Sequence, residues 1–155
     1  GKVLLTMFFQ NSNLLLAFLR DHNTARSVLD VFNDLYAMFG RETYCRLFPV
    51  ILTDRGSEFS NPVPIEQDEN GELRSLVFYC NPRAPYQNGG IEVALQQEDI
   101  DLMLSHINSY KRGKLNSRSA YQLFSFIYGD DILPKLNIHE IEPNDIVLSP
   151  KLLKK

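Results

Sequence analysis

The apolar positions of the chain fall into short runs that alternate with longer amphipathic stretches. The runs Val3–Phe9 and Leu14–Leu19 are separated by Gln10–Asn13, a connector rich in turn residues. Two apolar runs joined in this way predict an antiparallel hairpin. Both runs are apolar at successive positions, which predicts a sheet covered on both faces. The runs Val50–Leu52 and Leu76–Cys80 predict two further buried strands.

The clearest helix is predicted over Thr24–Phe39. Its apolar residues recur at spacings of three and four and share one face: Ala25, Val28, Leu29, Phe32, Leu35, Tyr36 and Phe39. Asn23 or Thr24 can cap the helix, and Gly40 suits its end because glycine readily adopts the left-handed conformation found there. The same stripe would also serve a helix that binds a partner, but packing into the core is the favoured interpretation. Arg41–Arg46 is predicted as a link to the next strand.

Two more helices are predicted in the second half of the chain. The stretch Ala94–Lys111 has one apolar face, formed by Ile100, Met103, Leu104, Ile107 and Tyr110. Ser119 is placed to cap a short helix that stops at Gly129. The residues of that helix predicted to face inward are Tyr121, Phe124, Ile127 and Tyr128.

The order of strands and helices predicts an α/β fold. A length of 155 residues fits one domain, and the pattern becomes loose from Asp130 onward. We therefore predict a folded domain over residues 1–129 and a C-terminal extension over residues 130–155. No internal repeat or low-complexity segment is visible.

Composition and charge narrow the function classes. With 44% hydrophobic and 23% charged residues the chain has the composition of an ordinary globular protein, and no apolar run is long enough to span a bilayer. Cys45 and Cys80 show neither metal-ligand spacing nor a disulfide framework, which favours a reducing cytoplasm and predicts both as buried. The net charge of −3 argues against strong nonspecific DNA affinity. It leaves open an active site for DNA, because such sites contain acidic metal ligands.

Asp54 is the first candidate for chemistry. It follows the apolar run Val50–Leu52, and Gly56 allows a tight exit that leaves the carboxylate unobstructed. Carboxylates at the strand ends of an α/β sheet often lie in functional clefts. An ordinary strand-to-loop turn explains the same residues, since aspartate and glycine are common in turns.

For three later polar segments, a structural role and a functional role both fit the residues. Asn81–Glu92 predicts a loop that leads into a helix with Glu92 in its first turn, where the helix dipole alone would also favour a glutamate. The basic run Lys111–Lys114 suits a helix C-terminus, which is the favoured role, and would also suit contact with phosphate. The acidic run Asp68–Glu72 is interpreted as a solvated loop rather than a metal site.

Four pieces of the sequence, in order, resemble the catalytic core of bacterial transposases of the insertion-sequence-30 type, which are relatives of retroviral integrases. The pieces are Leu52–Phe59, Phe78–Pro82, Ala84–Glu92 and Leu115–Phe124. The likeness covers most of the chain, from Lys2 to about Phe126.

This resemblance implies a ribonuclease-H-like fold over residues 1–129, a mixed sheet flanked by helices, with a triad of two aspartates and one glutamate. Asp54 matches the second aspartate and Glu92 the glutamate, so the two are the candidate catalytic residues and metal ligands. The implied metal is Mg²⁺ or Mn²⁺, and no organic cofactor is implied. The implied activity is DNA cleavage and strand transfer in the bacterial cytoplasm. The partners are transposon ends and target DNA, with a homodimer left open and no membrane partner.

The resemblance also suggests which residues contact DNA. Tyr86, Gln87 and Asn88 belong to the loop before Glu92 and are candidates to touch the strand that is cut or joined. The cations in this set are Arg55, Lys111, Arg112 and Lys114.

The chain departs from the family pattern at two places. The first aspartate of the triad belongs on a strand before Lys2–Phe9, and this chain begins after that point. After Glu92, Val93–Gln96 replaces a longer basic helix and loop. We therefore predict a fold that lacks the first strand and part of the helical region after the glutamate. Two hypotheses follow: an active transposase core, or an inactive remnant retained as a folded dimerisation or binding module.

Overall fold

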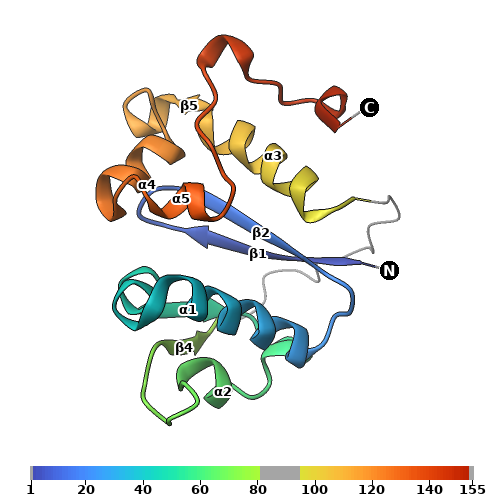
Figure 1. The fold of residues 1–155 in the computed structure, drawn as a ribbon, viewed down its shortest axis with the longest axis vertical. Coiled ribbons are helices and arrows are strands. Elements are labelled where there is room, and N and C mark those ends of the chain that lie inside the picture. The colour runs from blue at the N-terminus through green and yellow to red at the C-terminus, as the bar shows by residue number, and fades with distance from the viewer. Residues whose placement is uncertain (1, 81–94, 154–155) are drawn as a thin grey trace. The chain divides into compact units, whose positions relative to one another are not determined.

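The computed structural model describes residues 2–80 and 95–153, which form short strands and five α-helices (Figure 1). The chain divides into two units. The first comprises Arg20–Glu92 with Gly1–Val3, and the second comprises Leu4–Leu19 with Val93–Lys155. The prediction of an α/β fold is confirmed at this level.

The first unit begins with α1 (Ala25–Leu47), whose start follows a reciprocal cap. The hydroxyl of Thr24 accepts a hydrogen bond from the backbone N–H of Ser27, and the Ser27 hydroxyl accepts one from the N–H of Thr24. This confirms Thr24 as the cap. Gly40, predicted to end the helix, has a φ of +78° but only interrupts it, because the chain is helical again immediately afterwards. The predicted link Arg41–Arg46 is therefore wrong.

The extra turns of α1 after Gly40 are stabilised by two apolar side chains. Tyr44 and Leu47 are buried, and the Tyr44 ring packs 4.9 Å from that of Phe48, measured between ring centroids. Because glycine accommodates a single non-helical residue without steric cost, the helix changes direction there and resumes.

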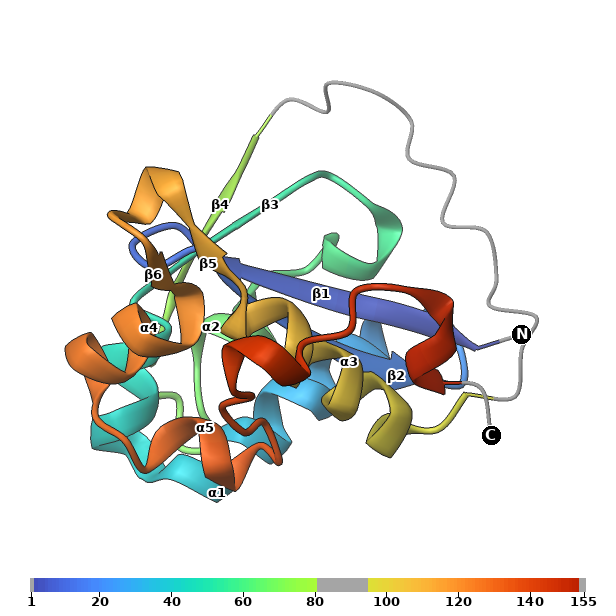
Figure 2. The same ribbon diagram turned by 90° about the horizontal axis from the view of Figure 1, so that it is seen from above.

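A parallel pair of strands, β3 (Val50–Thr53) and β4 (Leu76–Tyr79), completes the frame of this unit (Figure 2). Between them lie the short η1 (Ser57–Phe59) and α2 (Val63–Glu66). The two strands were predicted to be fully buried, and that prediction is wrong for one face. The exposed residues are paired across the strands, Val50 with Leu76 and Leu52 with Phe78, and each side chain is 42–57% exposed.

The second unit contains the predicted hairpin, β1 (Val3–Phe9) and β2 (Leu14–Arg20), except for the end residues Val3 and Arg20, which belong to the first unit. In β2 the side chains of Leu14, Leu16 and Ala17 are buried, whereas Phe8 on β1 is 56% exposed, so the sheet is not covered at every position. Helix α4 (Ala120–Tyr128) packs against the hairpin: the rings of Phe9 and Phe124 meet edge to face at 5.1 Å.

Helix α4 has the predicted ends. The Ser119 hydroxyl accepts from the backbone N–H of Gln122, and the Gln122 side chain accepts from the N–H of Ser119 in return. Gly129, with a φ of +105°, ends the helix. Phe124 faces inward as predicted, but Ile127 is 41% exposed, so its predicted burial is wrong.

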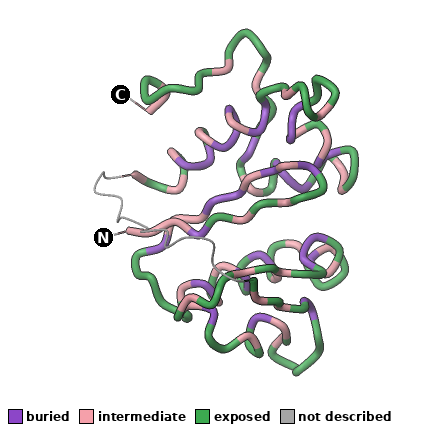
Figure 3. The backbone as a smooth tube through the Cα atoms, turned by 180° about the vertical axis from the view of Figure 1, so that it is seen from behind, coloured by how far each residue is buried: buried purple, intermediate pink, exposed green. Residues whose placement is uncertain are grey.

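Buried positions recur along helix α3 (Gln97–Ser109) (Figure 3). They include polar side chains as well as Ile100 and Leu104. The amide of Asn108 bonds both the N–H and the C=O of Leu15 on β2, at 3.0 and 2.8 Å. Gln97 bonds the N–H of Leu19 and the C=O of Ala17 in the same way. These side chains satisfy the edge of β2 much as a neighbouring strand would.

Three further side chains of α3 hold the C-terminal segment of the second unit. The hydroxyls of Ser105 and Ser109 accept hydrogen bonds from the N–H groups of His139 and Ile141, and Nδ1 of His106 accepts one from Val147. Upstream of these contacts, α5 (Ile132–Lys135) buries Ile132 and Leu133. The segment after residue 129 is therefore packed, although its sequence pattern is loose.

The remaining elements of the second unit are short. They are β5 (Lys111–Arg112), η2 (Gly113–Leu115), β6 (Arg118–Ser119), η3 (Pro143–Asp145) and η4 (Pro150–Leu153). Cys80 of the first unit is exposed, contrary to prediction. Over the residues described, no helix is both long enough and apolar enough to cross a bilayer.

We predict that Asn108→Ala destabilises the protein by about 2–4 kcal/mol, because it leaves two backbone groups of the half-buried Leu15 without partners. Urea denaturation followed by circular dichroism measures the change. Asn144→Ala, at an exposed position in η3, is the matched control and should change the free energy of unfolding by less than about 0.5 kcal/mol. Equal effects of the two substitutions would contradict the role given to Asn108.

Candidate functional site at the carboxyl ends of β3 and β4

The register of the parallel strands sets the position of Asp54. Thr53 is the partner of Tyr79, and the backbone N–H of Cys80 donates to the Thr53 carbonyl at 2.8 Å. Both strands therefore leave the sheet at the same edge. Asp54 follows β3 at that edge, and Cys80 is the last residue described before the range that contains Glu92. Ligand sites in α/β sheets commonly lie at the carboxyl ends of parallel strands.

The turn after Asp54 is tight because Gly56 lacks a side chain. The backbone N–H of Gly56 donates to Oδ1 of Asp54 at 3.0 Å. A Cβ atom at Gly56 would lie 3.0 Å from that same oxygen and 2.8 Å from Oε2 of Glu58. The φ of Gly56 is −58°, so the glycine is needed for space and not for its backbone conformation.

The carboxylates of Asp54 and Glu58 thus both lie beside the position that a Cβ atom of Gly56 would occupy. Glu58 lies in η1, and its neighbour Phe59 is buried. The Tyr79 hydroxyl donates a hydrogen bond to the Phe59 carbonyl, which ties η1 to the end of β4. Sequence reasoning missed Glu58, whose place beside Asp54 depends on this turn.

A buried cation lies near Glu58. Arg20 is 7% exposed, and its Nη1 and Nη2 donate to the side-chain oxygens of Ser27 and Asn23 at 2.8 and 3.3 Å. Its Nε is buried and has no hydrogen-bond partner among the described residues. Burial lowers the pKa of Arg20, and the negative charge of Glu58 opposes that shift. Glu58 is thus electrostatically coupled to Arg20 as well as adjacent to Asp54.

The chemistry of this edge suits a hard cation in part. Asp54 is exposed, and two carboxylates with only oxygen donors match the preference of Mg²⁺ or Mn²⁺. Within residues 2–80 and 95–153 no group of three histidine, cysteine, aspartate or glutamate side chains could hold a metal ion. The described pair therefore supplies a partial ligand set.

The other predicted site residues fall in three places. Arg55 is exposed beside Asp54. Tyr86, Gln87, Asn88 and Glu92 lie outside the described residues. The basic residues Lys111, Arg112 and Lys114 belong to the second unit.

Those basic residues begin directly after Tyr110, the C-cap of α3. Helix α3 ends at Ser109, two residues earlier than predicted, and Lys111 and Arg112 form β5, which pairs with β6 in antiparallel register. The favoured helix-end role stays a prediction. Arg118, which sequence reasoning missed, lies directly opposite Arg112. Like charges placed opposite each other destabilise a strand pair.

The acidic run is more ordered than a solvated loop. Oδ1 of Asp68 accepts hydrogen bonds from the N–H groups of Asn70 and Glu72, each at 2.9 Å. Its Oδ2 accepts from the Tyr36 hydroxyl at 3.0 Å and from Arg41 at 3.4 Å. These donors, led by the Glu72 N–H, hold the pKa of Asp68 below its ordinary value, against the opposing effect of burial.

No family model matches the chain, and no curated protein matches it either.

The lowered pKa of Asp68 predicts a specific loss of stability in acid. Its folded-state pKa lies below the unfolded value, so the carboxylate contributes stability above the unfolded pKa and loses it as the pH falls through the folded pKa. We expect Asp68→Asn to destabilise the protein at pH 7, and the gap from wild type to narrow below about pH 4. Urea denaturation at several pH values measures this gap. Asp34→Asn, at an exposed position on α1, is the control; a gap for Asp68→Asn that does not vary with pH contradicts the prediction.

Proposed function

We propose that the chain is the catalytic core, or a fragment of the core, of a transposase that cleaves and joins DNA strands with the help of a divalent metal ion. The observation that supports this most is the parallel register of β3 and β4. It brings Asp54 to the same sheet edge as Cys80, from which the chain continues toward Glu92. A carboxylate from each side of that edge is the arrangement that the family resemblance implies.

Each residue of the proposed site has a distinct role. Asp54 and Glu92 would hold Mg²⁺ or Mn²⁺, which supplies charge stabilisation and lowers the pKa of an attacking water or 3′-hydroxyl. Gly56 keeps the space beside the Asp54 carboxylate open. Arg55 is exposed beside it and suits contact with a DNA phosphate.

The β5–β6 hairpin supports contact with a polyanion. Lys111, Arg112, Lys114 and Arg118 lie within eight residues of one another, and none forms an ion pair with an acid that the structure describes. The cross-strand pair Arg112–Arg118 costs stability in isolation. A bound phosphate backbone would relieve that repulsion. Local positive charge of this kind is compatible with a net charge of −3.

We propose a ribonuclease-H-like arrangement as the finer fold. That fold combines a hairpin and parallel strands in one mixed sheet with helices on its faces. The hairpin β1–β2 and the parallel pair β3–β4 are the elements of this chain that would fill those roles.

A second candidate function is an inactive remnant that serves as a dimerisation module. It is supported by the apolar face of β3 and β4, where four large side chains stay 42–57% exposed. Parallel strands are usually covered on both faces, so a second copy of the chain could occupy this one.

The first test compares DNA strand transfer by the wild-type chain and by Asp54→Asn, with transposon-end DNA and Mg²⁺ or Mn²⁺. We expect the substitution to lower the rate about 100-fold or more, because it removes a metal ligand. Asp34→Asn should retain the wild-type rate. Equal rates for both variants would overturn the catalytic role of Asp54. Absence of activity in all three chains, with a concentration-dependent dimer in sedimentation velocity, would favour the second candidate.

The second test concerns the hairpin. Arg118→Gln should weaken DNA binding and reduce the slope of log affinity against log salt by about one. The same change should raise the free energy of unfolding by a few tenths of a kcal/mol, since it removes a like-charge pair (about 0.2–1 kcal/mol for such pairs). Fluorescence anisotropy and urea denaturation measure the two effects. Arg26→Gln, on exposed α1, is the control for DNA binding. An unchanged salt slope would contradict the assigned contact.

A further inference from the structure

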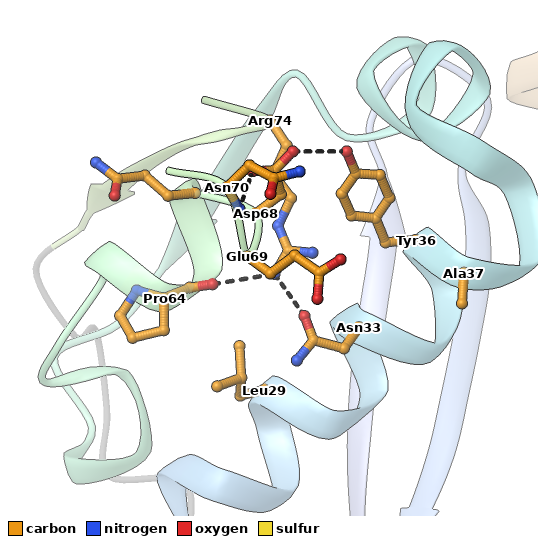
Figure 4. A pocket seen from close by; sticks show the side chains of 10 residues that line it. Leu29, Asn33, Tyr36, Ala37, Pro64, Asp68, Glu69, Asn70 and Arg74 are labelled. Atoms are coloured by element: carbon orange, nitrogen blue, oxygen red, sulfur yellow. Dashed lines mark hydrogen bonds between the residues drawn. The ribbon is translucent and has the colours of Figure 1, made fainter. Parts of the chain in front are cut away.

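A cleft of about 610 Å³ lies within the first unit, between α1, α2 and the loop that follows α2 (Figure 4). Its volume is within the range of about 300–1,000 Å³ that is usual for small-molecule sites. The residues that matter for its chemistry are Leu29, Tyr36, Ala37, Pro64, Asp68 and Arg74. All of them are described, and all belong to one unit.

The most unusual residue of the cleft is Arg74, whose guanidinium is nearly fully buried. The residue is 4% exposed. Its Nε donates to the Ile65 carbonyl at 3.0 Å, and its Nη2 donates to Oδ1 of Asn33 at 2.8 Å and to the Pro64 carbonyl at 3.0 Å. All three acceptors are neutral. They fix the orientation of the guanidinium without compensating its charge.

Aromatic rings are the other neighbours of this cation. The guanidinium carbon lies 4.9 Å from the ring centroid of Tyr36 and 5.5 Å from that of Tyr44. Such contacts stabilise a cation only partly. Among the described residues no carboxylate lies within 4.0 Å of Arg74. A buried charge without a counter-ion is costly, so its retention in a cleft indicates a role for the charge.

One nitrogen of Arg74 remains available. Nε and Nη2 are engaged, but Nη1 forms no hydrogen bond with any described residue. Because Arg74 lines the cleft, an acceptor that enters the cleft can meet this donor. The hydrogen bond would be charge-assisted and therefore stronger than one between neutral groups.

The surrounding charges favour a single negative charge on the ligand. Asp68, also in the cleft wall, already accepts hydrogen bonds from four donors. It therefore has little capacity left to bind a positively charged group of a ligand. Glu69 is exposed and lines the same cleft. Asp68 is already paired with Arg41, so Arg74 and Glu69 are the remaining charges of the cleft wall. A monoanion can be balanced by Arg74, whereas the second charge of a dianion such as phosphate would add to the repulsion from Glu69.

The remaining walls favour an apolar body. Leu29 and Ala37 on α1, Pro64 on α2 and the Tyr36 ring supply apolar surface along the same cleft. We propose that this cleft binds a small organic monocarboxylate, with its carboxylate on Nη1 of Arg74 and its apolar or aromatic body against Leu29 and Pro64. This site is separate from the Asp54 edge and does not depend on the proposed transposase function.

The experiment uses benzoate as the probe and benzamide as its uncharged match. In ¹H–¹⁵N NMR titrations of the whole chain, benzoate should shift the Arg74 Nε–H and the backbone amides of Gln67–Asn70, with a dissociation constant in about the millimolar range. Benzamide should bind at least about 10-fold more weakly, since it cannot form the charge-assisted bond. Inorganic phosphate should bind more weakly than benzoate. Equal binding of benzoate and benzamide, tighter binding of phosphate, or no saturable shift would each overturn the proposal.

Variants locate the site. Ala37→Trp places a large side chain in the cleft from an exposed position and should abolish the benzoate shifts without unfolding the protein. Met38→Trp, at the next exposed position and outside the cleft, should leave them unchanged. Arg74→Met should lose benzoate binding but keep any weak binding of benzamide. If Arg74→Met fails to fold, the tryptophan pair still decides: identical benzoate binding by the two variants overturns the assignment.

Discussion

The parallel pairing of β3 with β4 is the constraint on which the candidate site depends. Thr53 pairs with Tyr79, and the N–H of Cys80 closes the ladder on the Thr53 carbonyl. The hydrogen bond from Tyr79 to Phe59 then fixes the turn that follows Asp54. A slip of one residue would exchange the inner and outer faces and carry Asp54 away from its neighbours. Backbone pairing therefore sets where Asp54 leaves the sheet, and the Tyr79 side chain holds the turn that follows.

The sequence predicted where helices begin and end better than it predicted which side chains are buried. Thr24 and Ser119 were recognisable as caps, and Gly40 and Gly129 as interruptions, because each acts through backbone atoms a few residues away. The helix after Gly40 was missed because its stability comes from tertiary burial of Tyr44 and Leu47. Exposure of one face of β3 was missed for the same reason: a run of apolar residues does not say what covers it.

The candidate site was predictable to a similar extent. Asp54 was found because a carboxylate directly after an apolar run marks a strand end. Glu58 was missed because its approach to Asp54 requires the short turn around Gly56. Arg118 was missed because its position opposite Arg112 depends on a connection in which Asn116 and Ser117 both have positive φ. Such conformations are uncommon outside glycine, and neither of these two positions is a glycine.

Two buried arginines in the first unit have similar hydrogen-bond partners but different charged surroundings. Arg20 and Arg74 are both anchored by neutral acceptors, so hydrogen bonds orient each guanidinium while its charge remains uncompensated at close range. The negative charge of Glu58 opposes the effect of burial, which lowers the pKa of Arg20. Arg74 has no such carboxylate among the described residues, so its charge remains available to a ligand in the cleft.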